Sequence, residues 1–127
     1  LPFQNNFFGL ITITFGIRNF HSPDLALNEF NRVLKPGGKI AILEIFKSDK
    51  LNVTNFFFQL YFKLFPPILG KLVAKNQKAY KYLPRSVDNF TSVKELSAQI
   101  KNAGLQIIDT QATLFNHVNI IVAKKPN

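Results

Sequence analysis

Arg18 and Asn19 directly follow a strongly apolar segment, Leu10 to Phe15, which ends at Gly16. A guanidinium at the end of a buried strand can hold a carboxylate or stabilise an oxyanion that develops during a reaction. The amide beside it can both donate and accept hydrogen bonds. Spacing alone favours plainer roles, a structural salt bridge for Arg18 and a capped turn for Asn19, so the pair is a candidate site only in context.

Glu44 supplies a second candidate, because it stands near the end of another apolar segment, Lys39 to Phe46. In doubly wound sheets, ligands bind beyond the carboxyl ends of the strands. If the two apolar segments are parallel neighbours, the Arg18 loop and Glu44 meet at that edge. We therefore expect the chemistry of this chain at the carboxyl edge of a sheet.

A third group of candidates lies in an aromatic and basic segment in the middle of the chain. Between Lys50 and Arg85 there are basic residues but no Asp or Glu. Basic residues beside exposed aromatic ones suit a surface that meets anionic lipid and admits an apolar tail. Single-stranded nucleic acid and a core helix with a basic outer face remain alternatives. The aromatic residues are Phe56, Phe57, Phe58, Tyr61, Phe62 and Phe65.

Composition narrows the classes of site that the chain can hold. It has 127 residues with a net charge of +9, no cysteine and two histidines, His21 and His117, far apart in the sequence. Disulfides and thiolate metal sites are excluded, and we expect no metal site and structural roles for both histidines. The charge favours an anionic partner.

Local signals define the elements that must position these residues. Ser22, Pro23 and Asp24 predict the start of a helix, and Pro36-Gly37-Gly38 predicts the turn that ends it. Ser92 and Glu95 form a capping box for a later helix, which Gly104 follows. Between these helices, residues 51–72 have helical character broken by Pro66-Pro67. We expect no transmembrane helix there, because an uninterrupted apolar run of about 20 residues is missing.

Four strands are expected, and their order predicts an α/β fold. The first two, Leu10–Phe15 and Lys39–Phe46, flank a helix and should be parallel with a right-handed crossover. The last two, Leu105–Thr113 and Val118–Lys124, should form an antiparallel hairpin. Leu10–Phe15 is apolar enough to be buried on both faces and to need a neighbour on each side. Only one side can be filled by Lys39–Phe46, so we expect further parallel strands from an N-terminal half that precedes this chain.

Several of these motifs together resemble the ubiquinone/menaquinone-biosynthesis C-methyltransferases, over nearly the whole chain. The most specific is Phe15-Gly16-Ile17-Arg18-Asn19, whereas Arg32-Val33-Leu34-Lys35-Pro36-Gly37-Gly38 recurs in many methyltransferases. Leu1-Pro2-Phe3 and Leu43-Glu44 also match, as do Tyr80 to Leu83, Ser86 and Phe90 in the family's substrate-side segment. The resemblance implies the Rossmann-like class I fold, a mostly parallel sheet with one antiparallel strand. The chain, residues 1–127, would be the C-terminal part of one domain, without the glycine-rich cofactor loop.

The same resemblance implies an activity and roles for particular residues. The expected reaction is S-adenosylmethionine-dependent C-methylation of a polyprenylated quinol precursor, with Arg18 and Asn19 catalytic. Thr14 and Phe15 would contact the cofactor. We also expect a peripheral contact with a membrane and no binding of nucleic acid. The expected location is the cytoplasm or the surface of the inner membrane, on the matrix side if the protein is mitochondrial. The isolated chain is expected to be inactive. The expected substrate-binding residues are Phe57, Tyr61, Tyr80 and Tyr82.

Two alternative functions stay open at this point. One is a class I methyltransferase that acts on another small phenolic or lipid acceptor. Another is a non-catalytic fragment that binds a membrane or nucleic acid. A homodimer is also compatible with the sequence.

Overall fold

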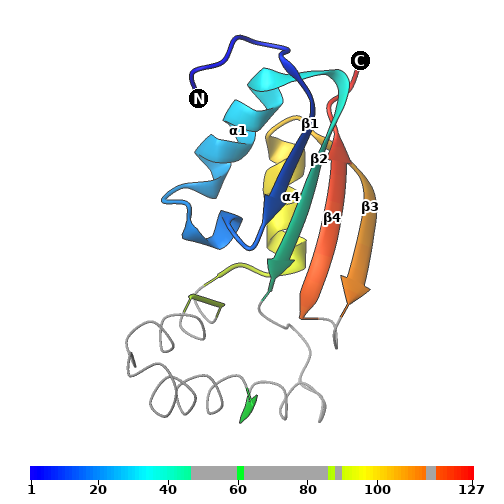
Figure 1. Cartoon of the computed structure of the whole chain (residues 1–127). Helices are drawn as coiled ribbons and strands as arrows, with labels where there is room; N and C mark the ends of the chain where they lie inside the picture. Colours follow the sequence, from blue (N-terminus) through cyan, green and yellow to red (C-terminus); the bar gives the residue numbers. More distant parts are fainter. Residues whose placement is uncertain (47–59, 62–85, 88–89, 114–116) are drawn as a thin grey trace.

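The strands of the described residues form a four-stranded sheet (Figure 1). The computed structural model describes residues 1–46, 60–61, 86–87, 90–113 and 117–127. The spatial order of the strands is β1-β2-β4-β3. β1 and β2 are parallel, and β4 is antiparallel to both β2 and β3, so three strands share one direction. The strands are β1 (Phe8–Thr14), β2 (Leu34–Ile45), β3 (Gln106–Thr113) and β4 (Val118–Lys124).

The parallel pairing of β1 with β2 confirms the expected alignment of the first two apolar segments. Ile11 lies opposite Ile40, and Ile13 lies opposite Ile42. The expectation that β1 is buried on both faces is wrong for this chain, because Leu10 is 58% exposed. In the part of the chain that the structure describes, β1 has β2 as its one strand neighbour. Among the described residues, nothing gives the outer edge and one face of β1 the covering that its apolar sequence predicts.

The junction between the first helix and β2 differs from the prediction. Helix α1 (Pro23–Val33) ends before the proline, and β2 already begins at Leu34. The register shifts here, since Phe8 lies opposite Leu34 but Leu10 lies opposite Lys39. The predicted Pro36-Gly37-Gly38 turn is thus a bulge within β2. A Cβ at Gly38 would lie 2.8 Å from a backbone carbonyl oxygen, which explains why glycine is needed there.

Two helices cover one face of the sheet (Figure 1). The N-cap of α1 is Ser22, as predicted, and its hydroxyl accepts from the Leu25 N–H. Helix α4 (Val93–Asn102) begins with the predicted capping box of Ser92 and Glu95. Apolar side chains from both helices, the strands and the adjoining loops form one core. The core consists of Ile17, Leu27, Phe30, Leu34, Ile40, Ile42, Phe46, Leu96, Ile100, Ala103, Leu105, Ile121 and Ala123.

The C-terminal hairpin follows the prediction closely. β4 has the predicted bounds, and β3 begins one residue later than expected, at Gln106. Gly104 has a φ of +82°, the left-handed conformation that commonly terminates a helix. The Lys125 ammonium then donates to the carbonyl oxygens of Asn31 and Leu34 at 2.7 and 2.9 Å. This contact ties the end of the hairpin to the end of α1.

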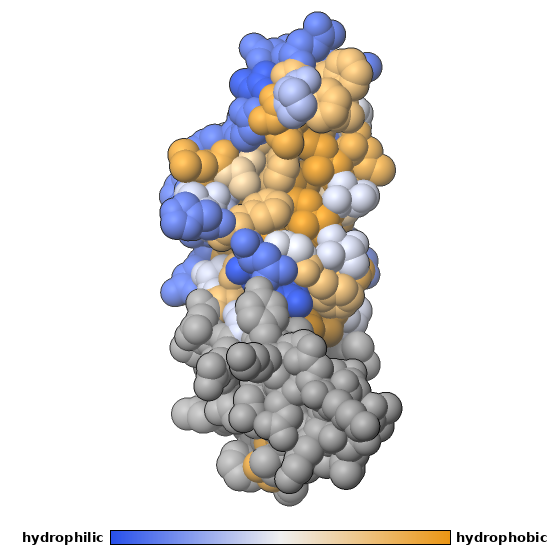
Figure 2. Space-filling view, turned by 60° about the vertical axis from the view of Figure 1, so that its left-hand side comes forward, coloured by the Kyte–Doolittle hydropathy of each residue, from blue (hydrophilic) through white to orange (hydrophobic). Residues whose placement is uncertain are grey.

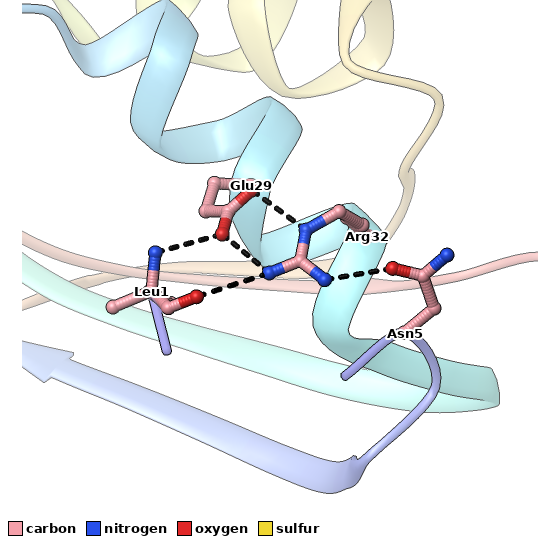
Figure 3. A network of polar contacts seen from close by, with 4 residues as sticks. All are labelled: Leu1, Asn5, Glu29 and Arg32. Carbon is pink, nitrogen blue, oxygen red and sulfur yellow. Dashed lines mark hydrogen bonds and ion pairs between the residues drawn. The ribbon is translucent and has the colours of Figure 1, made fainter. Parts of the chain in front are cut away.

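A polar network joins the N-terminal segment to α1 (Figure 3). Arg32 donates to both carboxylate oxygens of Glu29, at 2.8 and 2.6 Å, and to the side chain of Asn5 at 2.7 Å. The Leu1 amine lies 2.8 Å from Glu29. Hydrogen bonds from Arg32 and the amine lower the pKa of Glu29 to about 2. Because Glu29 and Arg32 are both substantially exposed, solvent screens this pair.

Candidate functional site

The carboxyl ends of β1 and β2 place the predicted site residues at one edge of the sheet. Thr14 ends β1 and is exposed. Phe15 has a φ of +51°, which non-glycine residues seldom adopt, and its N–H donates to the Leu43 carbonyl at 2.9 Å. Its ring stays 40% exposed. Residues in such sparsely populated conformations cluster at functional sites, so the backbone of Phe15 supports a functional site at this edge.

Arg18 lies in a short 3₁₀ turn, η1 (Ile17–Asn19), where the sequence predicted a loop. The turn packs against the sheet through Ile17, which is fully buried. The Asn19 N–H donates to the Gly16 carbonyl at 3.0 Å, while the residue itself is exposed. The turn thus directs Arg18 toward the interior and leaves Asn19 at the surface beside it.

Arg18 and Glu44 form an ion pair that is almost completely buried. The Arg18 side chain is 8% exposed and that of Glu44 is 0% exposed. Arg18 Nη1 donates to Glu44 Oε1, and the Arg18 backbone N–H approaches Oε2 at 3.5 Å. The Ile45 N–H donates to Oε1 at 2.8 Å. The main chain therefore fixes the carboxylate, and the carboxylate in turn fixes the guanidinium.

Ser86 adds a third contact from a distant part of the chain. Arg18 Nε donates to Ser86 Oγ at 3.3 Å, across 68 positions in the sequence. Ser86 belongs to the segment that resembles the family's substrate-side segment. The structure thus brings Ser86 to the Arg18 guanidinium, which spacing did not predict.

The start of β4 borders the ion pair on the other side. Asn119 is the register partner of Glu44, and His117 accepts a hydrogen bond through its carbonyl from the Phe46 N–H at 2.8 Å. Both Asn119 and His117 are buried. Burial lowers the pKa of His117, and a hydrogen bond with the Phe46 backbone opposes the shift. His117 is therefore neutral in the folded protein near pH 7.

The structure assembles part of the predicted site. Thr14, Phe15, Arg18 and Asn19 lie at one edge, as expected. Tyr61 is 53% exposed. The other expected substrate-binding residues, Phe57, Tyr80 and Tyr82, lie outside the described residues, as does most of residues 51–72.

The sequence placed Glu44 at this edge as a candidate, but it assigned Glu44 no role in the reaction and did not pair it with Arg18. The sequence held one signal for this pairing: Glu44 continues the series of every second residue, Ile40 and Ile42, whose side chains are buried in β2. A buried charge in such a series requires a partner. Ser86 gave no comparable signal.

Two further classes of feature are absent from the described part of the chain. No group of three or more His, Asp or Glu side chains there could hold a metal ion. No helix in the same residues is long and apolar enough to cross a membrane.

Comparison with known proteins places the chain beside methyltransferases. The model of the ubiE/COQ5 methyltransferase family matches residues 1–125. The Campylobacter jejuni ubiquinone/menaquinone biosynthesis C-methyltransferase UbiE is 35% identical over 125 residues, which cover 98% of this chain and 53% of that protein. The Staphylococcus aureus demethylmenaquinone methyltransferase is 44% identical over 104 residues, covering 82% of this chain and 43% of that protein. The chain thus spans about half the length of the curated relatives it matches.

A solved structure supports the same fold. A SAM-dependent methyltransferase from Aquifex aeolicus superposes with a TM-score of 0.59 at 17% identity, covering 98% of this chain and 49% of that one. At this identity the likeness concerns the fold alone. It agrees with the expected class I arrangement, in which one antiparallel strand interrupts an otherwise parallel sheet.

Proposed function

The chain belongs to the ubiE/COQ5 methyltransferase family, and from that premise we propose that it supplies the substrate-side half of a quinone-biosynthesis C-methyltransferase. The proposed reaction transfers a methyl group from S-adenosylmethionine to a ring carbon of a polyprenylated quinol. The observation that carries the proposal is the Arg18 guanidinium, held by Glu44 and Ser86 at the carboxyl edge of the sheet.

The proposal includes a second half of the domain, placed against β1. The exposed apolar side chains along this region include Phe3, Phe7 and Leu10, which are 42%, 46% and 58% exposed. Figure 2, turned toward the side of α1 and β1, shows a band of hydrophobic surface beside hydrophilic surface. An apolar edge strand without a neighbour favours pairing with another strand. Amide hydrogen exchange in β1 should therefore slow when the rest of the polypeptide is present.

The residues at this edge fit one side of an S-adenosylmethionine site. Thr14 offers an exposed hydroxyl and Phe15 a half-exposed ring at the end of β1. An aromatic face attracts a cation such as a sulfonium. The bound cofactor would supply an electrophilic methyl group. Its remaining contacts would come from the other half of the enzyme.

The mechanism assigned to this chain is stabilisation of developing negative charge. A ring carbon becomes nucleophilic when the neighbouring hydroxyl loses its proton, and Arg18 would stabilise the resulting phenolate. A guanidinium stays protonated in proteins, so Arg18 holds charge and does not act as the base. Asn19 would orient the ring oxygen. The carbon–carbon bond would form as the methyl–sulfur bond of the sulfonium breaks, and the proton at the methylated carbon would then pass to water, which leaves the ring aromatic again.

We further propose that the prenyl tail lies along an apolar surface near this edge, in contact with a membrane. Phe15, Phe20 and Leu25 are 40%, 38% and 71% exposed in and after the loop that carries Arg18. The net charge of +9 suits a surface of anionic lipid. Replacing Phe20 and Leu25 with Ser should weaken binding to anionic vesicles and lower activity on long-tailed quinols more than on short-tailed ones.

Product analysis with the complete enzyme tests the proposed reaction. The enzyme is incubated with methyl-labelled S-adenosylmethionine and prenylated benzoquinol or naphthoquinol, and the methylated atom is located by NMR. Label on a ring carbon of either quinol supports the proposal. Label on oxygen, or transfer only to an unrelated phenol, contradicts it.

Two substitutions of Arg18 separate catalysis from folding. Arg18→Ala should abolish methyl transfer, while the enzyme that stays folded should bind the cofactor with nearly wild-type affinity. Because this change also breaks a buried ion pair, Arg18→Lys is the companion variant, since it keeps the charge but loses the planar fork. Equal loss of cofactor binding and transfer in both variants would point to a structural Arg18.

A further inference from the structure

Glu44 lies in a position where a carboxylate is expensive. It alternates with Ile40, Ile42 and Phe46 along the face of the sheet that the helices cover, and all four are at most 1% exposed. Removing a carboxylate from water carries a large cost unless charged and hydrogen-bonding partners compensate it. A buried ion pair can often be replaced by apolar residues without loss of stability. Stability alone therefore gives weak grounds for a charged pair here.

The contacts of Glu44 point to a role that acts through Arg18. Main-chain N–H groups of Ile45 and Arg18 approach the two carboxylate oxygens, at 2.8 and 3.5 Å, so the carboxylate has little freedom to turn. The guanidinium is then held at two different nitrogens, Nη1 by Glu44 and Nε by Ser86. A donor fixed in this way needs no reorganisation when charge develops in front of it.

We propose that Glu44 is a positioning residue for methyl transfer: it orients the Arg18 guanidinium toward the ring hydroxyl and balances its charge in the resting site. The inference rests on the proposed function of the chain. Charge balance has a consequence of its own. With Glu44 present, the pair has no net charge. Its N–H groups still stabilise a phenolate oxygen that they contact directly, but the pair attracts a carboxylate elsewhere on the ring only weakly. Without Glu44, Arg18 would carry an unbalanced charge and would favour a ring with such a carboxylate.

Kinetics of the complete enzyme test this role through Glu44→Gln, which keeps the size of the side chain and removes its charge. We expect kcat to fall by about 100-fold, as for a small misplacement of a catalytic group, with cofactor affinity nearly unchanged. A prenylated hydroxybenzoate, whose ring carries a carboxylate, should inhibit this variant more strongly than the wild type. Glu29→Gln is the matched control, because it makes the same change in an exposed Glu–Arg pair and should leave kcat unchanged.

Ser86→Ala keeps the inference testable if Glu44→Gln does not fold. This variant removes the Nε contact alone, so kcat should fall several-fold while the melting temperature stays at the wild-type value. A folded Glu44→Gln enzyme with wild-type kcat and unchanged inhibition by the carboxylated ring would overturn the inference. So would wild-type kcat in Ser86→Ala if Glu44→Gln is unfolded.

The two proposals fail in different ways. If the wild-type complete enzyme does not methylate a prenylated quinol, the proposed function fails, and the inference fails with it. If the wild type is active but the Glu44→Gln enzyme is equally active, only the inference fails.

Discussion

The buried pair of Arg18 and Glu44 makes a strong prediction about stability. Arg18→Met removes the cation but keeps an apolar side chain of similar length, leaving a carboxylate that is 0% exposed without its partner. Breaking one side of a buried pair costs about 3–5 kcal/mol. The two side chains are 8% and 0% exposed, so solvent screening reduces this figure little. Against a typical domain stability of about 5–15 kcal/mol, the variant should be severely destabilised.

The double variant Arg18→Met/Glu44→Leu should regain most of that loss. Replacing a buried ion pair with apolar residues is often neutral or stabilising, although the Ile45 N–H here loses its side-chain acceptor. We expect its free energy of unfolding to lie within about 2 kcal/mol of the wild type. Methyl transfer should nevertheless stay absent, because the guanidinium is gone.

Urea denaturation of the complete protein, followed by circular dichroism, measures these differences. Arg32→Met is the control, because its pair with Glu29 is exposed and should contribute far less. Two results would refute the reasoning. One is a cost below about 1 kcal/mol for Arg18→Met, which is the range of a surface pair. The other is a double variant no more stable than the single one, since that would mean the lost stability came from packing.

Three further predictions concern stability elsewhere in the fold. Gly38→Ala should lower the free energy of unfolding by about 1–3 kcal/mol, measured by urea denaturation, because the new Cβ would lie 2.8 Å from a carbonyl oxygen. Gly9→Ala is the control and should be tolerated, because a Cβ at that position has no neighbour within 4 Å. The pKa of His117 is lowered below 6.5 in the folded protein, so the unfolded chain binds more protons in acid. The free energy of unfolding should therefore fall as the pH drops below about 6.5. His117→Gln should flatten that part of the pH–stability curve, and an unchanged slope would contradict the assignment. Ser92→Ala should cost about 1 kcal/mol through loss of the capping box, measured as a lower urea midpoint, and Ser97→Ala in the same helix should not.

Local signals predicted much of the fold because they act over a few residues. Ser22 and Ser92 cap their helices as expected, and Gly104 takes the left-handed conformation just past α4. The parallel pairing of the first two apolar segments followed from the strand–helix–strand order. The sequence predicted a turn at Pro36-Gly37-Gly38 and missed the bulge. The hydrogen bonds that hold these residues in the sheet are made with Lys125, which is far away in the sequence.

The site could be predicted only in part, because it too depends on contacts between residues that are far apart in the sequence. The position of Arg18 after an apolar strand indicated a residue at the carboxyl edge, and the structure places it there. Its partners come from 26 and 68 residues away. The expected strand pairing placed Glu44 at the same edge, but no local pattern indicated that Glu44 or Ser86 contacts Arg18. The burial of β1 was overestimated because its apolar composition implies neighbours that the described residues do not include.

Direct contact between the Arg18 guanidinium and the quinol ring is the central claim, and NMR of the complete enzyme with ¹⁵N-labelled arginine tests it most directly. The Arg18 Nε resonance, identified by its loss in Arg18→Lys, is followed during titration with a prenylated quinol in the presence of S-adenosylhomocysteine. We expect this resonance to shift as the quinol binds, and to stay in place when an isoprenoid without a ring is added. A resonance that does not move at saturating quinol would contradict the claim.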